Sequence, residues 1–173
     1  AQKNDLLPKL AAGEVIGTFA LAEGNGDPDA SRIKAKVKNG RLSGKKYPVT
    51  DGSIADFAVV VARDEANEIG LYFCDLSTSG ITSTPIETID PSRNTVSFNF
   101  ENAEVEPLGD AWLGWQSVQN LLDQAAIILA FEQLGGAQAC LEMARDYAIE
   151  RYAFGRPIGS FQAVKHKLAN VYI

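Results

Sequence analysis

The 173-residue chain has two cysteines, one histidine and an excess of negative charge, and each shortage removes a class of function. Cys74 and Cys140 have no paired spacing, which argues against a disulfide or a metal cluster and predicts two reduced core residues. His166 has no cysteine or carboxylate at metal or triad spacing, so we expect no metal site. The net charge of −6 provides no clustered basic patch for nucleic-acid phosphates.

Long hydrophobic runs are missing as well. No stretch of uncharged apolar residues is long enough for a membrane span, and the N-terminal residues lack a basic segment followed by an apolar run. A hydrophobic content of 46% with 22% charged residues is typical of a globular chain with a buried core. We therefore expect a soluble, cytoplasmic protein with neither membrane nor nucleic acid as a partner.

The residues before about position 110 show the pattern of short strands. Runs rich in β-branched and aromatic residues, separated by turn residues, occupy 14–22, 31–44, 55–63, 67–75 and 94–108. Asn39-Gly40 lies between two alternating runs and predicts a type I′ hairpin turn, in which both central residues need a positive φ. Because no helical pattern separates the runs, we expect an antiparallel sandwich or barrel rather than a parallel nucleotide-binding sheet.

The pattern becomes helical after residue 115. No proline occurs from Gln116 to Arg151, and apolar residues recur at helical spacing. Ser160 then suits the N-cap of a second helix. The first helix is apolar almost all round over 121–131, which is typical of a helix buried in a bundle. Since two helices do not complete a bundle, we expect a piece of a longer polypeptide.

Three segments together resemble the acyl-CoA dehydrogenase family. They are "ARDYAIERYAFGRPIGSFQAVKHKLANVYI", "LSGKKYPVTDGSIADFAVVVAR" and "LPKLAAGEVIGTFALAE". The resemblance implies an α+β chain: an antiparallel β-barrel or sandwich middle domain over 1–110, then two long helices of an incomplete four-helix bundle over 111–173. Residues 1–13 would be the tail of a missing helical N-terminal domain.

The chemistry that the resemblance implies is the α,β-dehydrogenation of an acyl-CoA thioester. A glutamate takes the α-proton, FAD accepts a hydride, and an electron-transfer flavoprotein reoxidises the flavin. The resemblance also implies assembly with itself or with a homologous subunit, as a dimer or tetramer. Acyl-CoA, the electron-transfer flavoprotein and a second subunit are thus the expected partners.

Cofactor residues follow from the "RYAFGRPIGSFQ" turn. Arg151 matches an arginine that meets the FAD pyrophosphate of a neighbouring subunit, Phe154 an aromatic residue near the adenosine, and Gln162 a polar contact to the dinucleotide. A guanidinium can bind two phosphate oxygens at once. The alternative is structural: Arg151 caps its helix and Phe154 fills a turn.

The rest of the expected site departs from the family pattern. Ala22 stands where the family commonly has a threonine whose hydroxyl bonds the flavin, and Pro48 where a tryptophan often shields the ring, while Thr50 keeps a nearby hydroxyl. Asp123 matches a position that often meets CoA, although it also reads as an exposed aspartate near a helix start. Ala126 replaces the arginine usually found three residues further on.

A catalytic base is not expected within this segment. In most of the family it lies beyond residue 173, and in a minority it aligns with Ala125, which carries no carboxylate. The nearby carboxylates, expected to be solvated or ion-paired, are Glu132, Glu142 and Glu150. Two functions remain open: an acyl-CoA dehydrogenase that is catalytic when complete, and a non-catalytic partner subunit with a degenerate flavin site in a hetero-oligomer.

Overall fold

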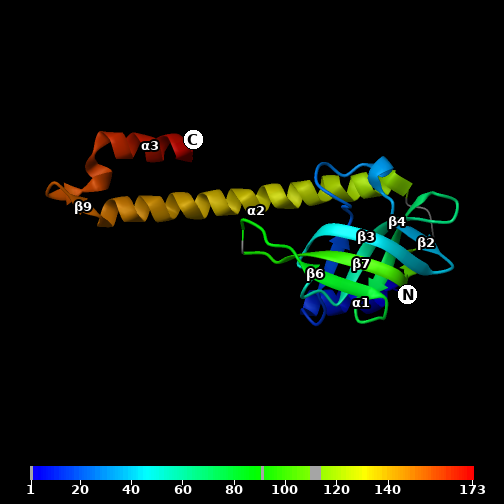
Figure 1. The fold of residues 1–173 in the computed structure, drawn as a ribbon. Helices are drawn as coiled ribbons and strands as arrows, with labels where there is room; N and C mark the ends of the chain where they lie inside the picture. Colours follow the sequence, from blue (N-terminus) through cyan, green and yellow to red (C-terminus); the bar gives the residue numbers. More distant parts are fainter. Residues whose placement is uncertain (1, 91, 110–113) are drawn as a thin grey trace. The chain divides into compact units, whose positions relative to one another are not determined.

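The computed structural model describes residues 2–90, 92–109 and 114–173. The chain divides into two compact units, a sheet unit up to Val118 and a helical unit from Gln119 onward (Figure 1). This division confirms the α+β class. The domain boundary predicted between residues 110 and 111 lies outside the described residues.

The sheet unit contains helix α1 and eight strands. Their bounds are α1 (Gln2–Ala12), β1 (Gly17–Ala20), β2 (Lys36–Lys38), β3 (Arg41–Thr50), β4 (Phe57–Arg63), β5 (Ile69–Asp75), β6 (Ile81–Pro85), β7 (Thr95–Glu104) and β8 (Glu106–Pro107), with a 3-10 turn, η1 (Ala30–Arg32). The strand order is β6-β7-β3-β2-β4-β5-β8, and β1 pairs with β4. Among the described residues no strand pairing joins β6 to β8, so the sheet is not a closed barrel.

The predicted strands are present, but their pairing is mixed. Strands β1 and β2 both pair with β4 in parallel, and the other pairs are antiparallel. The expectation of a wholly antiparallel sheet is therefore wrong at these two pairs. Alternation within a strand shows which side chains share a face, but it does not show which distant strand becomes the neighbour. Strand β6 was not anticipated.

The Asn39-Gly40 turn is confirmed. Asn39 and Gly40 have φ values of 49° and 70°, and the flanking residues Lys38 and Arg41 are paired across β2 and β3. Both central residues adopt the left-handed region, as a type I′ turn requires. The turn sets the register of β2 on β3, and β3 carries Lys46, Tyr47, Pro48 and Thr50, which are discussed below.

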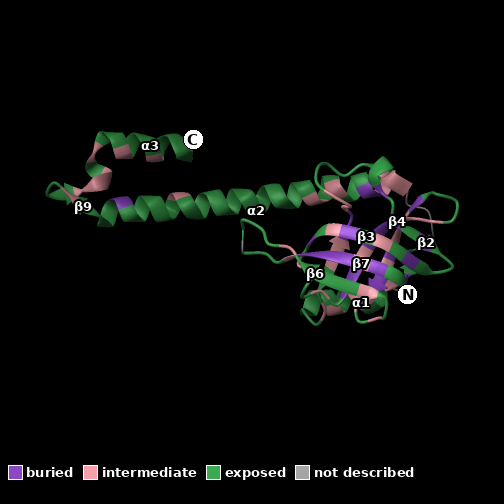
Figure 2. Cartoon of the chain, in the orientation of Figure 1, coloured by how far each residue is buried: buried purple, intermediate pink, exposed green. Residues whose placement is uncertain are grey.

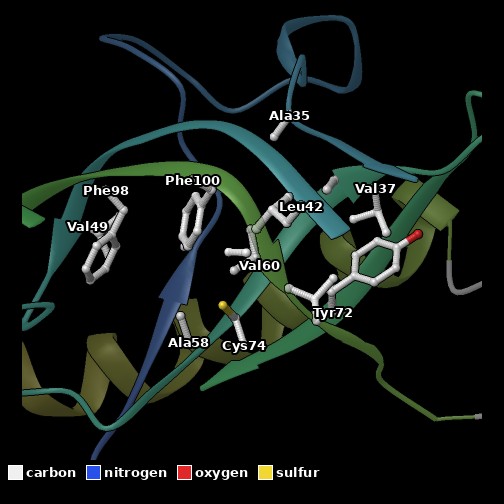
Figure 3. Close-up of a cluster of buried hydrophobic side chains, with 14 of the residues drawn as sticks. Ala35, Val37, Leu42, Val49, Ala58, Val60, Tyr72, Cys74, Phe98 and Phe100 are labelled. Atoms are coloured by element: carbon white, nitrogen blue, oxygen red, sulfur yellow. The ribbon is translucent and has the colours of Figure 1, made fainter. Parts of the chain in front are cut away.

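A hydrophobic core lies within the sheet unit (Figures 2 and 3). Phe98 and Phe100 of β7 pack with Val49 of β3 and Val60 of β4, and all four are almost fully buried. Cys74 lies in the same cluster, and burial raises the pKa of its thiol to about 11. The prediction of a buried cysteine is thus right for Cys74.

The helical unit consists of all but the first residues of helix α2, a short hairpin and helix α3. Helix α2 (Gly114–Glu150) is followed by β9 (Tyr152–Ala153), β10 (Arg156–Pro157), the 3-10 turn η2 (Ile158–Ser160) and α3 (Gln162–Tyr172). Helix α2 has 37 residues and α3 has 11.

Two expectations about this unit are wrong. Cys140 is exposed on α2 rather than buried in a core. Ser160 is not the N-cap of α3: it closes η2, where its hydroxyl donates to the Pro157 carbonyl at 2.7 Å, and Phe161 takes the cap position without a side-chain hydrogen bond. A serine before a helical pattern can satisfy a preceding turn instead of the helix.

Candidate functional site

The loop that follows β1 is attached to β3 by its backbone. The Tyr47 amide donates to the Ala22 carbonyl at 2.8 Å, and the Gly24 amide donates to the Tyr47 carbonyl at 2.9 Å. From Leu21 to Lys34 the loop lines a hollow of about 280 Å³. Ala22 therefore lies beside β3 with its backbone carbonyl already engaged.

Beneath this loop lies a buried ion pair. Lys46 is fully buried, and its ammonium group donates to Glu23 Oε1 at 2.7 Å and to the Leu21 carbonyl at 3.0 Å. Burial lowers the pKa of Lys46, and the hydrogen bond to Glu23 opposes that shift. The Glu23 carboxylate also accepts the backbone amides of Lys34 at 2.8 Å and Ala35 at 3.0 Å. One carboxylate thus joins three parts of the chain.

Two arginines and an aspartate hold the far side of the loop. Arg63 donates to the carbonyls of Ile33 and Ala30 at 2.8 and 2.6 Å, and Arg32 donates to the Asn25 carbonyl at 2.9 Å. Asp29 caps η1 through the Ser31 amide at 2.8 Å. These bonds give an exposed, polar loop a defined conformation.

Thr50 and Pro48, like Ala22, belong to the sheet unit. Both are exposed on β3. The Thr50 carbonyl accepts the Thr18 hydroxyl of β1 at 2.7 Å, which fixes the end of the strand. The structure therefore brings the expected flavin-ring residues onto one strand and the loop attached to it.

Arg151 begins the turn after α2, and its backbone is fixed on both sides. Its amide donates to the Tyr147 carbonyl at 2.8 Å, and its carbonyl accepts the Ile158 amide at 2.8 Å. Its side chain is exposed. The turn also lies against α2, because a Cβ at Gly159 would come within 2.9 Å of the Ala148 carbonyl oxygen.

Phe154 and Gly155 form the tip of the β9–β10 hairpin. Both have a positive φ, 53° and 78°. Glycine adopts this region freely, whereas a bulky side chain does so at a conformational cost. The Phe154 side chain is 96% exposed and makes an edge-to-face contact with Phe161 at 6.1 Å between centroids. The Arg156 guanidinium lies 4.1 Å from the centroid of the Phe161 ring.

Gln162 is the first residue of α3 and is exposed. Arg151, Phe154 and Gln162 thus belong to one short segment of the helical unit, and the backbone of that segment is fixed by hydrogen bonds. Exposed apolar rings at strained backbone positions often mark binding sites. The assignment of these three residues to a cofactor stays a prediction.

Asp123 is exposed on α2. It precedes Arg151 by 28 residues, and a helical rise of 1.5 Å per residue separates the two by roughly 40 Å. Ala125 is half-buried on the same helix and offers no carboxylate. Glu142 accepts the Gln138 side chain at 3.0 Å, and Glu132 and Glu150 are exposed. His166 is exposed on α3.

The described residues contain no cluster of three or more metal-ligating side chains. In the same part of the chain no helix combines the length and the apolar character needed to cross a membrane.

The Glu23–Lys46 pair was not identified from the sequence. The sequence nevertheless contains an indication of it. Leu42, Gly44 and Lys46 occupy alternate positions of β3, so the lysine side chain lies on the same face as a buried leucine. A lysine at an inward position requires a buried partner. Nothing local, however, identifies Glu23 as that partner, because it lies 23 residues away.

Known proteins resemble this chain over nearly its whole length. The model of the acyl-CoA dehydrogenase C-terminal domain matches residues 113–173. An acyl-CoA dehydrogenase of Bacillus subtilis (strain 168) is 34% identical over 98% of this chain and 48% of its own length. The chain spans about half the length of the curated relatives it matches.

Solved structures agree. Butyryl-CoA dehydrogenase from Megasphaera elsdenii matches with a TM-score of 0.87 and 29% identity, over 99% of this chain and 48% of the other. A glutaryl-CoA dehydrogenase from Mycobacterium smegmatis in complex with FADH2 matches with a TM-score of 0.85 and 30% identity, over 98% and 46%. The chain belongs to the acyl-CoA dehydrogenase family.

Proposed function

We propose that this chain is part of an FAD-dependent acyl-CoA dehydrogenase, which introduces an α,β double bond into an acyl-CoA thioester. The observation that carries the proposal is the segment Arg151–Gln162, where an exposed guanidinium, an exposed aromatic ring and an exposed amide stand on a fixed backbone. Relatives that share this fold are acyl-CoA dehydrogenases, and one was solved with FADH2.

The exposed side chains of this segment fit a dinucleotide. A guanidinium makes charge-assisted, bidentate bonds to phosphate oxygens. No ion pair is formed by Arg151 with the residues that the structure describes, so its donors are available for the FAD pyrophosphate. Phe154 offers an exposed ring to the adenosine, and Gln162 a polar contact. In the sheet unit, Thr50 and the backbone around Ala22 would hold the flavin ring.

When bound, FAD supplies the hydride acceptor that no side chain can provide. The residues of this chain then bind and orient: Asp123 would contact the CoA portion of the substrate. None of its carboxylates stands at an aligned base position, since Ala125 occupies the one within α2. The proton is therefore taken by a residue of the complete protein outside this chain, and residues 1–173 alone should show no dehydrogenase activity.

We further propose that Arg151 serves the FAD of a neighbouring subunit. The separation of roughly 40 Å along α2 between Asp123 and Arg151 argues that one chain contributes these residues to two different sites. The protein would then be at least a dimer, with itself or with a homologous subunit, and an electron-transfer flavoprotein would reoxidise it. Its free thiols, Cys74 and Cys140, suit the reducing cytoplasm.

The test is FAD binding by the complete protein with Arg151→Ala and Arg151→Lys. Loss of a charge-assisted phosphate contact, worth about 1.5–3 kcal/mol, should weaken FAD by about tenfold to a hundredfold in Arg151→Ala. Arg151→Lys should weaken FAD binding less, because the positive charge remains and only the bidentate geometry of the guanidinium is lost. Arg145→Ala is the matched control, since Arg145 is exposed on α2 and pairs with Asp146.

Unchanged FAD affinity and occupancy in Arg151→Ala, with a small drop in melting temperature, would show that Arg151 only ends its helix. The measurement is bound FAD per subunit, with the melting temperature recorded on the same samples.

A second function is favoured by three side chains. Ala22 has no hydroxyl for the flavin, Pro48 no aromatic ring to cover it and Ala126 no charge for CoA. These losses suit a non-catalytic partner subunit that contributes scaffold to a hetero-oligomer. The two functions differ in the remaining sequence: a glutamate at the base position of the missing helices supports the enzyme, and its absence supports the partner subunit.

A further inference from the structure

One buried carboxylate closes the loop between Leu21 and Ala35. Glu23, near the start of the loop, accepts the amides of Lys34 and Ala35 at its end, at 2.8 and 3.0 Å. The Lys46 ammonium holds the same carboxylate at 2.7 Å and the Leu21 carbonyl at 3.0 Å. Both ends of the loop are thereby bound to the same ion pair, Glu23–Lys46.

Stability of the sheet does not by itself explain why an ion pair stands here. The Lys46 side chain is 0% exposed and that of Glu23 7% exposed, so both charges have lost most of their hydration. Well-packed apolar residues at such positions are often as stabilising as a buried ion pair or more so. A carboxylate, however, can accept several donors at once, which an apolar side chain cannot.

We propose that Glu23 and Lys46 are positioning residues that hold the loop 21–35 in its flavin-binding conformation. The inference rests on the proposed function, because it takes Ala22 and Thr50 to be part of the flavin site. Ala22 is adjacent to Glu23, and its carbonyl is bonded to the Tyr47 amide, next to Lys46. Opening the Glu23–Lys46 contact would leave the segment around Ala22 held to β3 only by its two backbone hydrogen bonds with Tyr47.

The consequence is a loss of FAD affinity without a matching loss of stability. When only a fraction of the molecules holds the competent loop, the apparent Kd rises by the inverse of that fraction. The double variant Glu23→Leu/Lys46→Met removes both charges and every acceptor for the two loop amides. If the double variant leaves the loop in its FAD-binding conformation in about one molecule in ten, the Kd for FAD rises about tenfold.

The experiment uses the complete protein and three readouts: the Kd for FAD, the melting temperature, and hydrogen–deuterium exchange of peptides covering residues 22–36. Glu23→Leu/Lys46→Met should lower the melting temperature no more than Val105→Ala does, weaken FAD about tenfold or more, and exchange faster in the loop. Val105→Ala is the control for a thinned sheet core, because Val105 is buried outside the loop. It should lower the melting temperature without changing the Kd.

A second variant covers the case in which the first fails to fold. Glu23→Gln/Lys46→Met keeps one oxygen acceptor, so its loop should exchange at an intermediate rate and its Kd should rise by a smaller factor, about threefold. FAD affinity equal to wild type in a folded double variant would overturn the inference, as would a loss no larger than in a core variant of equal stability. If the wild-type protein binds no FAD, the proposed function fails, whereas loop exchange still decides whether the pair holds the loop.

Discussion

The sheet unit and the helical unit distribute their apolar side chains in opposite ways. In the sheet unit Phe98 and Phe100 are each only 2% exposed. On α2, Ile128 is 69% exposed and Phe131 70% exposed. Figure 2 shows most of that helix in the colour of exposed residues. The first unit closes its own core, whereas the second leaves apolar surface that its own residues do not cover.

The cause lies in the geometry of the two kinds of element. A strand has neighbours on both sides, and alternate side chains of several strands face the same interior. In the helical unit, α2 has only the 11-residue α3 to pack with. A groove of about 670 Å³ remains, lined by both helices, among them by Leu134, Leu141 and Leu168. A helix that is apolar on most sides requires more neighbours than one.

The largest expected effect is a difference in stability between two matched phenylalanine-to-alanine substitutions, one in each unit. Phe98→Ala should lower the free energy of unfolding by about 3–5 kcal/mol, because it removes a buried ring and leaves a cavity. Phe131→Ala should change it by about 0.5 kcal/mol or less in the chain 1–173 at dilute concentration. Urea unfolding followed by circular dichroism measures both. Equal losses for the two variants would mean that the exposed face of α2 is covered.

Self-association is the next effect. An apolar helix face of this extent is a protein-interaction surface, and two chains could combine their helices into one core. The chain 1–173 should therefore form dimers or larger species at micromolar concentration, as seen by light scattering. Ile128→Glu/Phe131→Glu should shift it toward the monomer. Lys3→Glu, at an exposed position of α1, is the control, and a wild-type chain that stays monomeric contradicts the prediction.

The reactivity of the two cysteine thiols compares the same two units, because Cys74 lies in the sheet unit and Cys140 in the helical unit. Cys74 is buried with a pKa of about 11, so its thiol is both protonated and shielded at pH 8. Cys140 is exposed on α2. At submicromolar concentration one thiol per chain should react rapidly with a maleimide, and the second only after unfolding. Cys140→Ser removes the fast reaction, and its persistence in that variant would place the reactive thiol at Cys74.

The smallest expected effect is a loss of stability in acid. Hydrogen bonds from Ser77 lower the pKa of Asp75 below its ordinary value near 3.8, and Ser31 does the same for Asp29. Between the folded pKa and 3.8 the unfolded chain binds more protons, so stability falls as the pH falls through that window. Thermal unfolding from pH 5 to pH 2 should show a shallower decline for Ser77→Ala. An identical slope would indicate that the hydrogen bond from the Ser77 hydroxyl contributes nothing, since Ser77→Ala keeps the bond from the backbone amide.

Local patterns in the sequence determined much of the sheet unit. Asn39-Gly40 predicted its turn because two consecutive positive φ values are favourable for few residue pairs. The five β-rich runs each contain a strand, since alternation and β-branching act over a few residues. The segment 144–173 was one of the three that together indicated the family, and its turn combines an arginine, an aromatic residue, glycine and glutamine at fixed spacing.

The tertiary structure decided what depends on distant parts of the chain. The parallel pairing of β1 with β4 joins segments about 40 residues apart, as the register of Gly17 on Phe57 shows. No local pattern specifies such a partner, because every strand offers the same backbone donors and acceptors. The partnership of Glu23 with Lys46 depends on that same assembly: a carboxylate and an ammonium with ordinary surroundings in the sequence become a buried pair only when the loop closes over β3.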